Sequence, residues 1–487
     1  MVIDERRRAS TGIPGFDEVL DGGLIGGRTY LISGPPGSGK TTLGWHFLCE
    51  GLRAGETVLY ISFAESEGEL RANAALSGFA ADGVNVVDLS PSPELFARAE
   101  TYDIFSVSEV EREPTTARIV EAVERLKPQR VFVDSMTHLR FLASDGFHFR
   151  RQALSFLRYL ADRGAAVLVT SESTAESSDD DVRFIADGVI ELDLDARGRT
   201  LCVTKFRGSG FRIGKHTLAL GAGGATVFPR LIPSQHVRSF VAEKLSSGLP
   251  NLDALLHGGL ERGSVSLISG PTGVGKTTLG VQFMKEAARA GLRSVIYTFD
   301  EPAETILLRC EAVGMGVRSM LQEGMLEVVE LEAMRYGPDE FANFVRRDVD
   351  ENGTRIVMID SVSGYRLSVT GGDLAERLHA LGRYLQNVGV TLLLIDELRE
   401  LTHFRATEVG ISYLADNLIF LRYVERTIDS TPQLRKGIGV LKKRMSDFEK
   451  TVREFTITSD GVQIGSVLHL SSVFASLPRE TNGDSNP

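Results

Sequence analysis

Two stretches of the sequence match the pattern GxxxxGK[ST], which is typical of loops that bind nucleotide phosphates. Backbone N–H groups of such a loop surround the phosphates, the lysine ammonium bridges the outer two, and the hydroxyl completes a Mg²⁺ shell. Each stretch follows an expected strand and precedes an expected helix, as the pattern requires. The residues predicted to hold Mg-ATP are Gly34, Gly37, Ser38, Gly39, Lys40, Thr41 and Thr42, and Gly270, Gly273, Val274, Gly275, Lys276, Thr277 and Thr278.

An aspartate ends an apolar run downstream of each loop. These aspartates are Asp134, after Val-Phe-Val, and Asp360, after Val-Met-Ile. A buried strand that ends in aspartate places a carboxylate beside a phosphate-bound metal. Such a residue is often only a turn former, but its pairing with two phosphate loops favours the metal role. The predicted Mg²⁺ ligands are Thr41, Asp134, Thr277 and Asp360.

Hydrolysis of ATP needs a further group that orients or deprotonates the attacking water. The candidates follow two other expected strands: Glu65 in the first half of the chain, and Asp300 with Glu301 in the second. The first half has Ala64 where the second has Asp300. Because neighbouring strand residues point to opposite faces, we do not expect Glu65 simply to replace the carboxylate that is absent at position 64.

The two loops belong to two copies of one plan. Residues 11–17 (TGIPGFD) return as residues 247–253 (SGLPNLD), and the phosphate loops keep the same offset of 236 residues. A unit of this size is far longer than a solenoid repeat, so the pattern indicates a tandem of whole domains. We predict domains at residues 1–235 and 236–475, followed by a polar tail at 476–487 that frays.

Short β-rich runs alternate with helical patterns in each copy. The expected strands are residues 29–33, 57–63, 130–133 and 166–170 in the first copy, and 264–269, 294–299, 355–359 and 390–395 in the second. Expected helices include residues 115–126 and 151–161. This alternation predicts an α/β fold in which a mostly parallel central sheet is covered by helices on both faces.

Composition excludes several classes of protein. The 487 residues are 42% hydrophobic and 24% charged, as in ordinary globular proteins. Three scattered cysteines and nine histidines show no metal spacing, so phosphate-bound magnesium is the only metal predicted. Without a signal peptide or an apolar run of about 18 residues, the chain is expected to be cytosolic, with no membrane contact. The net charge of −11 disfavours nucleic acid.

At these residues the chain resembles the KaiC family, RecA-like P-loop ATPases whose best-known member is the cyanobacterial clock autokinase. That family also has two tandem RecA-like domains with a similar opening motif in each, so the resemblance covers nearly the whole chain. The segment from Lys205 to Ser209 (KFRGS) resembles the family's Lys-x-Arg-Gly strand, and Lys442-Lys443-Arg444 resembles its second-domain counterpart.

The resemblance implies a homo-oligomer, a hexameric ring, in which these basic residues reach the ATP of the neighbouring subunit. Lys205, Arg207, Lys442 and Arg444 would then be trans-acting catalytic fingers. By themselves, these residues would be interpreted as solvated strand charges.

Family sites use adjacent acids at the strand end, which implies that Asp300 and Glu301 form the better-equipped pair. Ala64 departs from this pattern, so the first domain is expected to bind ATP mainly to hold the ring together. The autokinase also carries a Ser-Thr pair as its own phosphate acceptor. Here Ser412 is the candidate phosphoacceptor, although Tyr413 replaces the threonine and a purely structural serine remains an alternative.

The resulting hypothesis is a Mg-dependent ATPase ring with Ser/Thr autophosphorylation in the second domain, used with protein partners in signalling or timing. One alternative is a nucleotide-gated scaffold with little catalysis. Another is a recombinase-like motor acting on DNA, which the acidic stretch at residues 172–181 disfavours because DNA binding needs positive charge and stacking groups.

Overall fold

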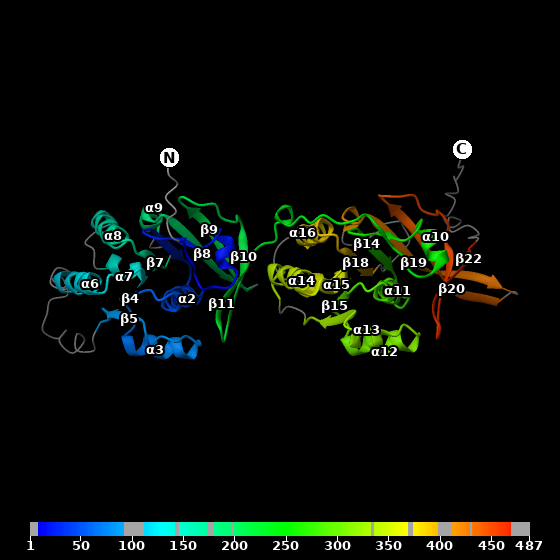
Figure 1. The fold of residues 1–487 in the computed structure, drawn as a ribbon, viewed down its shortest axis with the longest axis horizontal. Helices are drawn as coiled ribbons and strands as arrows, with labels where there is room; N and C mark the ends of the chain where they lie inside the picture. Colours follow the sequence, from blue (N-terminus) through cyan, green and yellow to red (C-terminus); the bar gives the residue numbers. More distant parts are fainter. Residues whose placement is uncertain are drawn as a thin grey trace, which may run out of the picture. The chain divides into compact units, whose positions relative to one another are not determined.

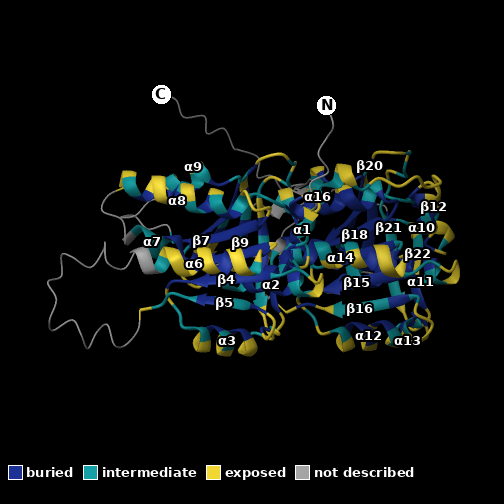
Figure 2. Cartoon of the chain, turned by 60° about the vertical axis from the view of Figure 1, so that its left-hand side comes forward, coloured by how far each residue is buried: buried dark blue, intermediate teal, exposed yellow. Residues whose placement is uncertain are grey.

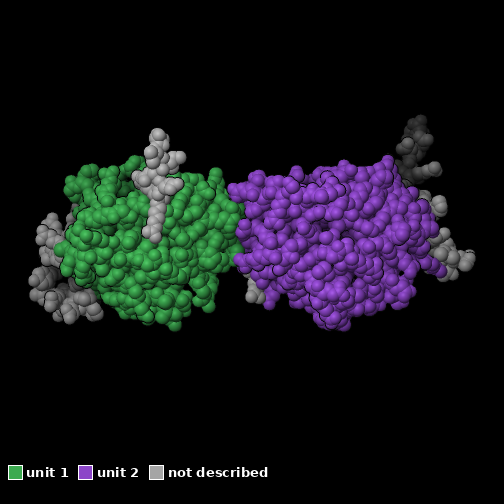
Figure 3. All heavy atoms as spheres, viewed as in Figure 1, with its two compact units in different colours: residues 1–230 green, residues 231–487 purple. Residues whose placement is uncertain are grey.

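The computed structural model describes residues 8–91, 112–141, 146–172, 179–196, 198–332, 336–368, 374–397, 411–428 and 431–468. The chain divides into two compact units, Met1–Arg230 and Leu231–Pro487 (Figures 1 and 3). The predicted tail at 476–487 and residues 173–178 of the acidic stretch lie outside the described ranges. Among the helices of those ranges, none combines the length and apolar character that crossing a bilayer requires.

The first unit is built on a nine-stranded sheet with the order β11-β10-β9-β8-β3-β7-β6-β4-β5. Neighbouring strands from β8 to β5 are parallel, and β9, β10 and β11 extend the sheet in antiparallel fashion. In sheet order from β11 the strands are Gly224–Phe228, Lys215–Gly221, Gly198–Phe206, Gly188–Asp195, Thr29–Ser33, Ala166–Ser171, Arg130–Asp134, Val58–Ser62 and Asn85–Asp88.

The second unit repeats this plan with the order β16-β15-β17-β18-β14-β19-β20-β21-β22. Strands from β16 to β19 are parallel to their neighbours, and β20 to β22 are antiparallel. In the same order the strands are Leu326–Glu330, Ser294–Thr298, Ile356–Asp360, Thr391–Glu397, Val265–Gly270, Asn417–Ile428, Thr431–Lys443, Arg453–Thr458 and Gly461–Val467.

Helices pack on these sheets (Figure 1). In the first unit they are α1 (Phe16–Val19), α2 (Lys40–Arg53), α3 (Glu67–Leu76), α6 (Arg112–Leu126), α7 (Met136–Phe141), α8 (Gly146–Ala161) and α9 (Asp180–Ile185). In the second they are α10 (Pro250–Leu255), α11 (Lys276–Arg289), α12 (Ala303–Ala312), α13 (Val317–Gln322), α14 (Pro338–Asn352), α15 (Val362–Ser368) and α16 (Leu374–Asn387), with the 3₁₀ turns η1 (Pro233–Gln235) and η2 (Ile411–Tyr413). Short strand pairs join β1 (Arg8–Ala9) to β2 (Leu24–Ile25), and β12 (Lys244–Leu245) to β13 (Leu260–Glu261).

The first unit's sheet is buried on both faces. Within β3, Tyr30 and Ile32 join the core that contains Phe47 of α2, whereas Leu31 joins the opposite core with Leu157 of α8. This division follows from the period of two along a strand, and it explains why the central strands are continuous apolar runs. Figure 2 shows the buried strands between helices whose outer sides are exposed. The predicted α/β fold with mostly parallel, helix-covered sheets is confirmed.

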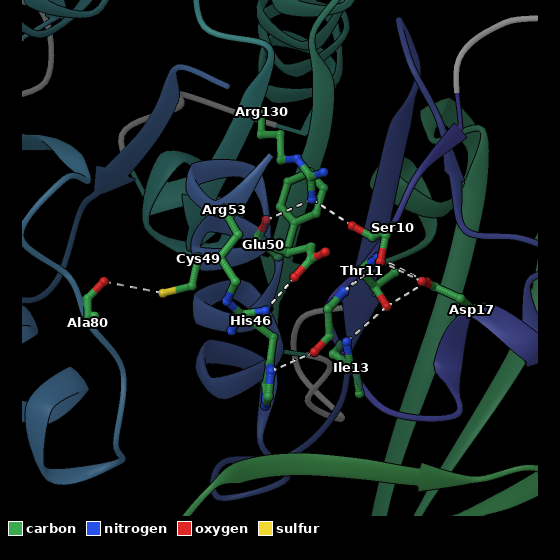
Figure 4. Close-up of polar contacts among 12 residues, drawn as sticks. Ser10, Thr11, Ile13, Asp17, His46, Cys49, Glu50, Arg53, Ala80 and Arg130 are labelled. Atoms are coloured by element: carbon green, nitrogen blue, oxygen red, sulfur yellow. Dashed lines mark hydrogen bonds and ion pairs between the residues drawn. The ribbon is translucent and has the colours of Figure 1, made fainter. Parts of the chain in front are cut away.

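The repeated opening segment forms a local turn held by an aspartate. Asp17 accepts hydrogen bonds from the Thr11 amide at 2.9 Å and the Thr11 hydroxyl at 2.7 Å (Figure 4). Asp253 does the same for Ser247, at 2.8 and 2.7 Å. His46 of α2 then ties the first of these turns to the core, since its Nδ1 lies 3.0 Å from the Gly12 carbonyl oxygen. The aspartate and the hydroxyl residue of the repeated segment therefore recur because both copies form the same hydrogen-bonded turn.

A buried arginine connects the same region to the sheet. Arg130, at the start of β6, is 2% exposed, and it forms an ion pair with Glu56. Its guanidinium also donates to the carbonyl oxygens of Ser10 at 2.6 Å and Phe47 at 2.9 Å (Figure 4). The guanidinium carbon lies 4.9 Å from the centre of the Phe47 ring. One side chain thus satisfies groups on three separate segments.

Candidate functional site

Each glycine-rich loop joins a central strand to a long helix. The first loop connects β3 to α2, and the second connects β14 to α11. α2 and α11 begin at the loop lysine, and the preceding residues, Gly39 and Gly275, have φ of 105° and 112°. At Gly34 an added Cβ would lie 2.6 Å from the Leu192 carbonyl oxygen, so only glycine fits there. Both loops therefore present the N-terminal amides and the positive dipole end of a 14-residue helix, where anions bind.

Each loop lysine folds back across its loop. Lys40 Nζ donates to the carbonyl oxygens of Gly34 at 2.8 Å and Pro35 at 3.1 Å. Lys276 Nζ makes the equivalent bonds to Gly270 at 2.9 Å and Pro271 at 3.0 Å. Burial lowers the pKa of both ammonium groups, and nearby carboxylates oppose that shift. A phosphate placed in the loop would give these cations a charged acceptor, and charge-assisted hydrogen bonds are the stronger kind.

The threonine after each lysine meets the aspartate predicted at the end of another strand. Thr41 Oγ1 donates to Asp134 at 2.8 Å, and Thr277 Oγ1 donates to Asp360 at 2.7 Å. Burial raises the pKa of the Asp360 carboxyl. A hydroxyl and a carboxylate form a hard oxygen donor pair suited to Mg²⁺. In the described part of the chain, no cluster of three His, Cys, Asp or Glu residues could hold a metal, so such a cation would need phosphate and water oxygens as well.

In the first unit these groups line a cavity of about 380 Å³. Its walls include Gly37, Gly39, Lys40, Thr41, Thr42, Tyr60, Ala64, Glu65, Asp134, Ser135, His138 and Glu172. The cavity thus brings together the residues predicted for the first unit's phosphate, metal and acid roles, except Gly34 and Ser38, which do not line it. His138 and Glu172 were not predicted as site residues. Both follow closely after the ends of strands, β6 and β7, and this position in the sequence could have indicated them. A larger, mostly apolar hollow of about 910 Å³ lies between α6 and α8 and contains no phosphate-loop residue.

The predicted acids of the second unit have separate partners. Asp300 accepts a hydrogen bond from the Ser361 hydroxyl at 2.5 Å, and Glu301 forms an ion pair with Arg309 at 2.8 Å. In the first unit, Glu65 accepts from the Asn73 side-chain amide at 3.0 Å. The structure therefore places Glu65 just after β4 in the first unit, and both Asp300 and Glu301 just after β15 in the second.

The four basic residues predicted as fingers lie elsewhere. Lys205 pairs across the sheet with Val189, which is level with Leu31 in the middle of β3. Its Nζ donates to the carbonyl oxygens of Arg183 at 2.9 Å and Phe184 at 3.1 Å, near the end of α9. Arg207 lies 3.7 Å from Asp187. Neither basic residue lines the first unit's cavity, so the structure does not bring them to that unit's own phosphate loop.

The second unit repeats this arrangement around the candidate phosphoacceptor. Lys442 Nζ donates to the carbonyl oxygens of Ser412 at 3.0 Å and Ala415 at 2.7 Å. Arg444 lies 3.6 Å from Asp416 and donates to the Tyr413 carbonyl oxygen at 3.0 Å. Ser412 is half-buried in η2. The basic pair and Ser412 therefore form one cluster.

Comparison with known proteins identifies the architecture. The family model described as "ATPase: KaiC" matches residues 9–232 and again residues 245–468. The chain is 27% identical to a circadian clock oscillator protein KaiC of Prochlorococcus marinus strain MIT 9313, with 98% of this chain and 97% of that protein covered. It is 29% identical to the circadian clock protein KaiC3 of a Synechocystis species, with 98% and 96% covered. The two matched regions contain the two phosphate loops, and the chain therefore belongs to the KaiC family of ATPases.

Proposed function

We propose that both units bind Mg-ATP, that the chain assembles into a homo-oligomeric ring of six subunits, and that the second unit hydrolyses ATP and phosphorylates Ser412. The observation that carries the nucleotide part is the repeated geometry of lysine, threonine and aspartate, with Thr–Asp distances of 2.8 and 2.7 Å in the two units. Two independent copies of a phosphate loop beside a strand-ending carboxylate fit one ligand, a magnesium-bound triphosphate.

The proposed mechanism divides the work among residues of the second unit. The loop amides and Lys276 bind the β- and γ-phosphates, and Thr277 with Asp360 would hold Mg²⁺. The metal, when bound, neutralises charge that develops on the phosphate oxygens. Asp300 orients the attacking water and accepts its proton, while Glu301 is held in an ion pair with Arg309. Adjacent strand-end acids with different partners support this division of roles.

Ring assembly explains the placement of the basic residues. Because Lys205 and Arg207 do not line their own unit's cavity, a catalytic role for them requires a phosphate bound by another subunit. The same reasoning extends to Lys442 and Arg444 by their equivalent contacts. Such trans-acting cations raise phosphoryl-transfer rates by about 10³ to 10⁵ in other NTPases. The relatives' names point to timing, and we propose ATP-driven switching with protein partners in signalling or timing.

Equilibrium dialysis tests the nucleotide proposal. The protein with Mg²⁺ is expected to retain ATP at both loops, because both present the same amides, ammonium and oxygen pair. Phosphate release should accompany retention. Failure to retain ATP in the presence of Mg²⁺ would reject the assignment for both units.

The acceptor is tested with γ-labelled ATP. Ser412→Ala is expected to lose the protein-bound label while keeping phosphate release, because it removes one hydroxyl and leaves the Lys442 contact with the backbone carbonyl intact. Ser319→Ala, an exposed serine of α13 in the same unit, is the matched control and should keep its label. Label that persists in Ser412→Ala would remove Ser412 from this role. No label in the unaltered protein would favour a plain ATPase or a scaffold.

A further inference from the structure

The two units differ by a linked exchange of residues beside the phosphate loop. Where the second unit has Asp300, the first has Ala64; where the second has Gly364, the first has His138. His138 and Gly364 are each the fourth residue after the strand-ending aspartate and the third residue of the following helix, α7 or α15. One unit thus pairs a carboxylate with glycine, and the other pairs alanine with imidazole.

The second unit shows why these positions are coupled. A Cβ added at Gly364 would lie 2.5 Å from both carboxylate oxygens of Asp300. A side chain at position 364 and a carboxylate at position 300 therefore compete for the same space. The Asp300 carboxylate accepts a hydrogen bond from the Ser361 hydroxyl at 2.5 Å. Glycine at position 364 leaves room for that contact.

In the first unit the ionisable side chain is on the helix, at position 138, instead of at the strand end. Parallel pairing of β4 with β6 sets Ser62 beside Asp134, as β15 and β17 set Thr298 beside Asp360. The Ser135 hydroxyl, the counterpart of Ser361, lies 3.1 Å from His138 Nδ1. The imidazole therefore has the same serine partner that the carboxylate has in the second unit, and it lines the cavity that contains Lys40.

Other acids in this cavity do not account for the exchange. Glu65 and Glu172 both line it, but each has a counterpart in the second unit, Glu301 and Glu397, at the end of the equivalent strand. These acids are common to both units, so they do not replace a group that one unit lacks. His138 is the ionisable side chain that comes with the loss of the carboxylate at position 64.

We propose that His138 takes the place of the absent carboxylate as the base for ATP hydrolysis in the first unit, a role that rests on the proposed ATPase function. The water oxygen bonds to the γ-phosphorus as the bond from that phosphorus to the bridging oxygen breaks, and the bridging oxygen keeps the electron pair on ADP. The water proton passes to Nε2 of the imidazole and then to solvent, a role that requires the tautomer in which Nδ1–H donates to Ser135 Oγ across the 3.1 Å contact. The products are ADP and inorganic phosphate.

The experiment isolates the first unit by silencing the second in two ways, Lys276→Ala and the pair Asp300→Asn with Glu301→Gln. In each background His138→Ala is expected to lower kcat for phosphate release by about 10²-fold, at the lower end of the range for general bases. KM and ATP retention by dialysis should stay unchanged, because the residue acts on water and not on the nucleotide.

Introducing the second unit's residue pair into the first unit is the control. If His138 had only a structural role, this exchange would not restore the rate. Ala64→Asp alone should not raise the rate, since the carboxylate meets His138, whereas Ala64→Asp with His138→Gly reproduces the second unit's pair. That double variant should be at least about tenfold faster than His138→Gly alone. A double variant no faster than His138→Gly would overturn the exchange of roles.

Failure of this inference is distinguishable from failure of the proposed function. If Lys40→Ala, which leaves only the second unit, releases phosphate while the isolated first unit does not, His138 is no base and the ATPase proposal stands. An unchanged kcat in His138→Ala, or a loss of ATP retention together with the rate, would also overturn the role. If neither unit releases phosphate, the ATPase proposal itself fails.

Discussion

Replacing Lys276 with alanine is expected to abolish incorporation of γ-phosphate into the protein and to lower phosphate release by the second unit by at least about 10²-fold. Lys276 is the cation of the second loop, held by the carbonyl oxygens of Gly270 and Pro271 at 2.9 and 3.0 Å. Without it the γ-phosphate loses a positioned positive charge in a partly buried site, where such charges are worth more than in water. Scintillation counting of protein-bound label measures the effect.

Lys40→Ala is the matched control, because Lys40 makes the same two carbonyl contacts in the first loop. We expect this variant mainly to assemble poorly, since the sequence leads us to expect that the first unit binds ATP to hold the ring together, and to be labelled wherever the ring still forms. Size-exclusion chromatography with ATP and Mg²⁺ measures assembly. Equal labelling of Lys276→Ala and the unaltered protein would show that the second loop does not supply the transferred phosphate.

The largest expected loss of stability follows from Arg130→Met. Methionine fills much of the same volume, but it leaves Glu56, which is 10% exposed, without its cation. The carbonyl oxygens of Ser10 and Phe47 also lose a donor. Breaking a largely buried ion pair from one side costs about 3–5 kcal/mol, because the charge that remains has lost its ion-pair partner and has little access to water. We therefore expect the free energy of unfolding of the first unit to fall by about that amount.

Trp45 makes this loss measurable in the full chain, because it is the only tryptophan of the sequence and is buried in the first unit. Its fluorescence during urea unfolding reports that unit alone. Arg53→Met is the control: Arg53 also pairs with a glutamate, Glu50, but is 64% exposed, and exposed pairs contribute about 0–1 kcal/mol. Equal midpoints for Arg130→Met and Arg53→Met would show that the buried pair contributes nothing special to stability.

The sequence predicted the parts of the fold that depend on local chemistry. The expected strand at residues 29–33 is β3, Thr29–Ser33, and the loop after it leads into α2. Central parallel strands are buried on both faces and read as apolar runs, so their ends could be located to within one or two residues. Edge strands were missed for the same reason: β5 (Asn85–Asp88) is half-buried at three of four positions and offers no apolar run.

Contacts between side chains far apart in the sequence could be predicted only where two motifs lie at the carboxyl edge of the same parallel sheet. The Thr41–Asp134 contact followed from that geometry, because strand ends of this kind meet at one edge. The contacts of Lys205 did not, since they depend on where α9 ends beside β9. Neither the pairing of Ser135 with His138 nor the competition between Asp300 and Gly364 leaves a local pattern in the chain.

The sequence by itself determined that this protein has two copies of a phosphate-binding domain, because glycine, lysine and threonine at fixed spacing suffice to define the loop that binds phosphate. Only the tertiary structure decided which further side chains face each loop. Positions 64 and 138 line one cavity because β4 and β6 lie side by side in the sheet. Short-range forces such as packing and hydrogen bonding act between atoms in contact, and separation along the chain does not specify that contact.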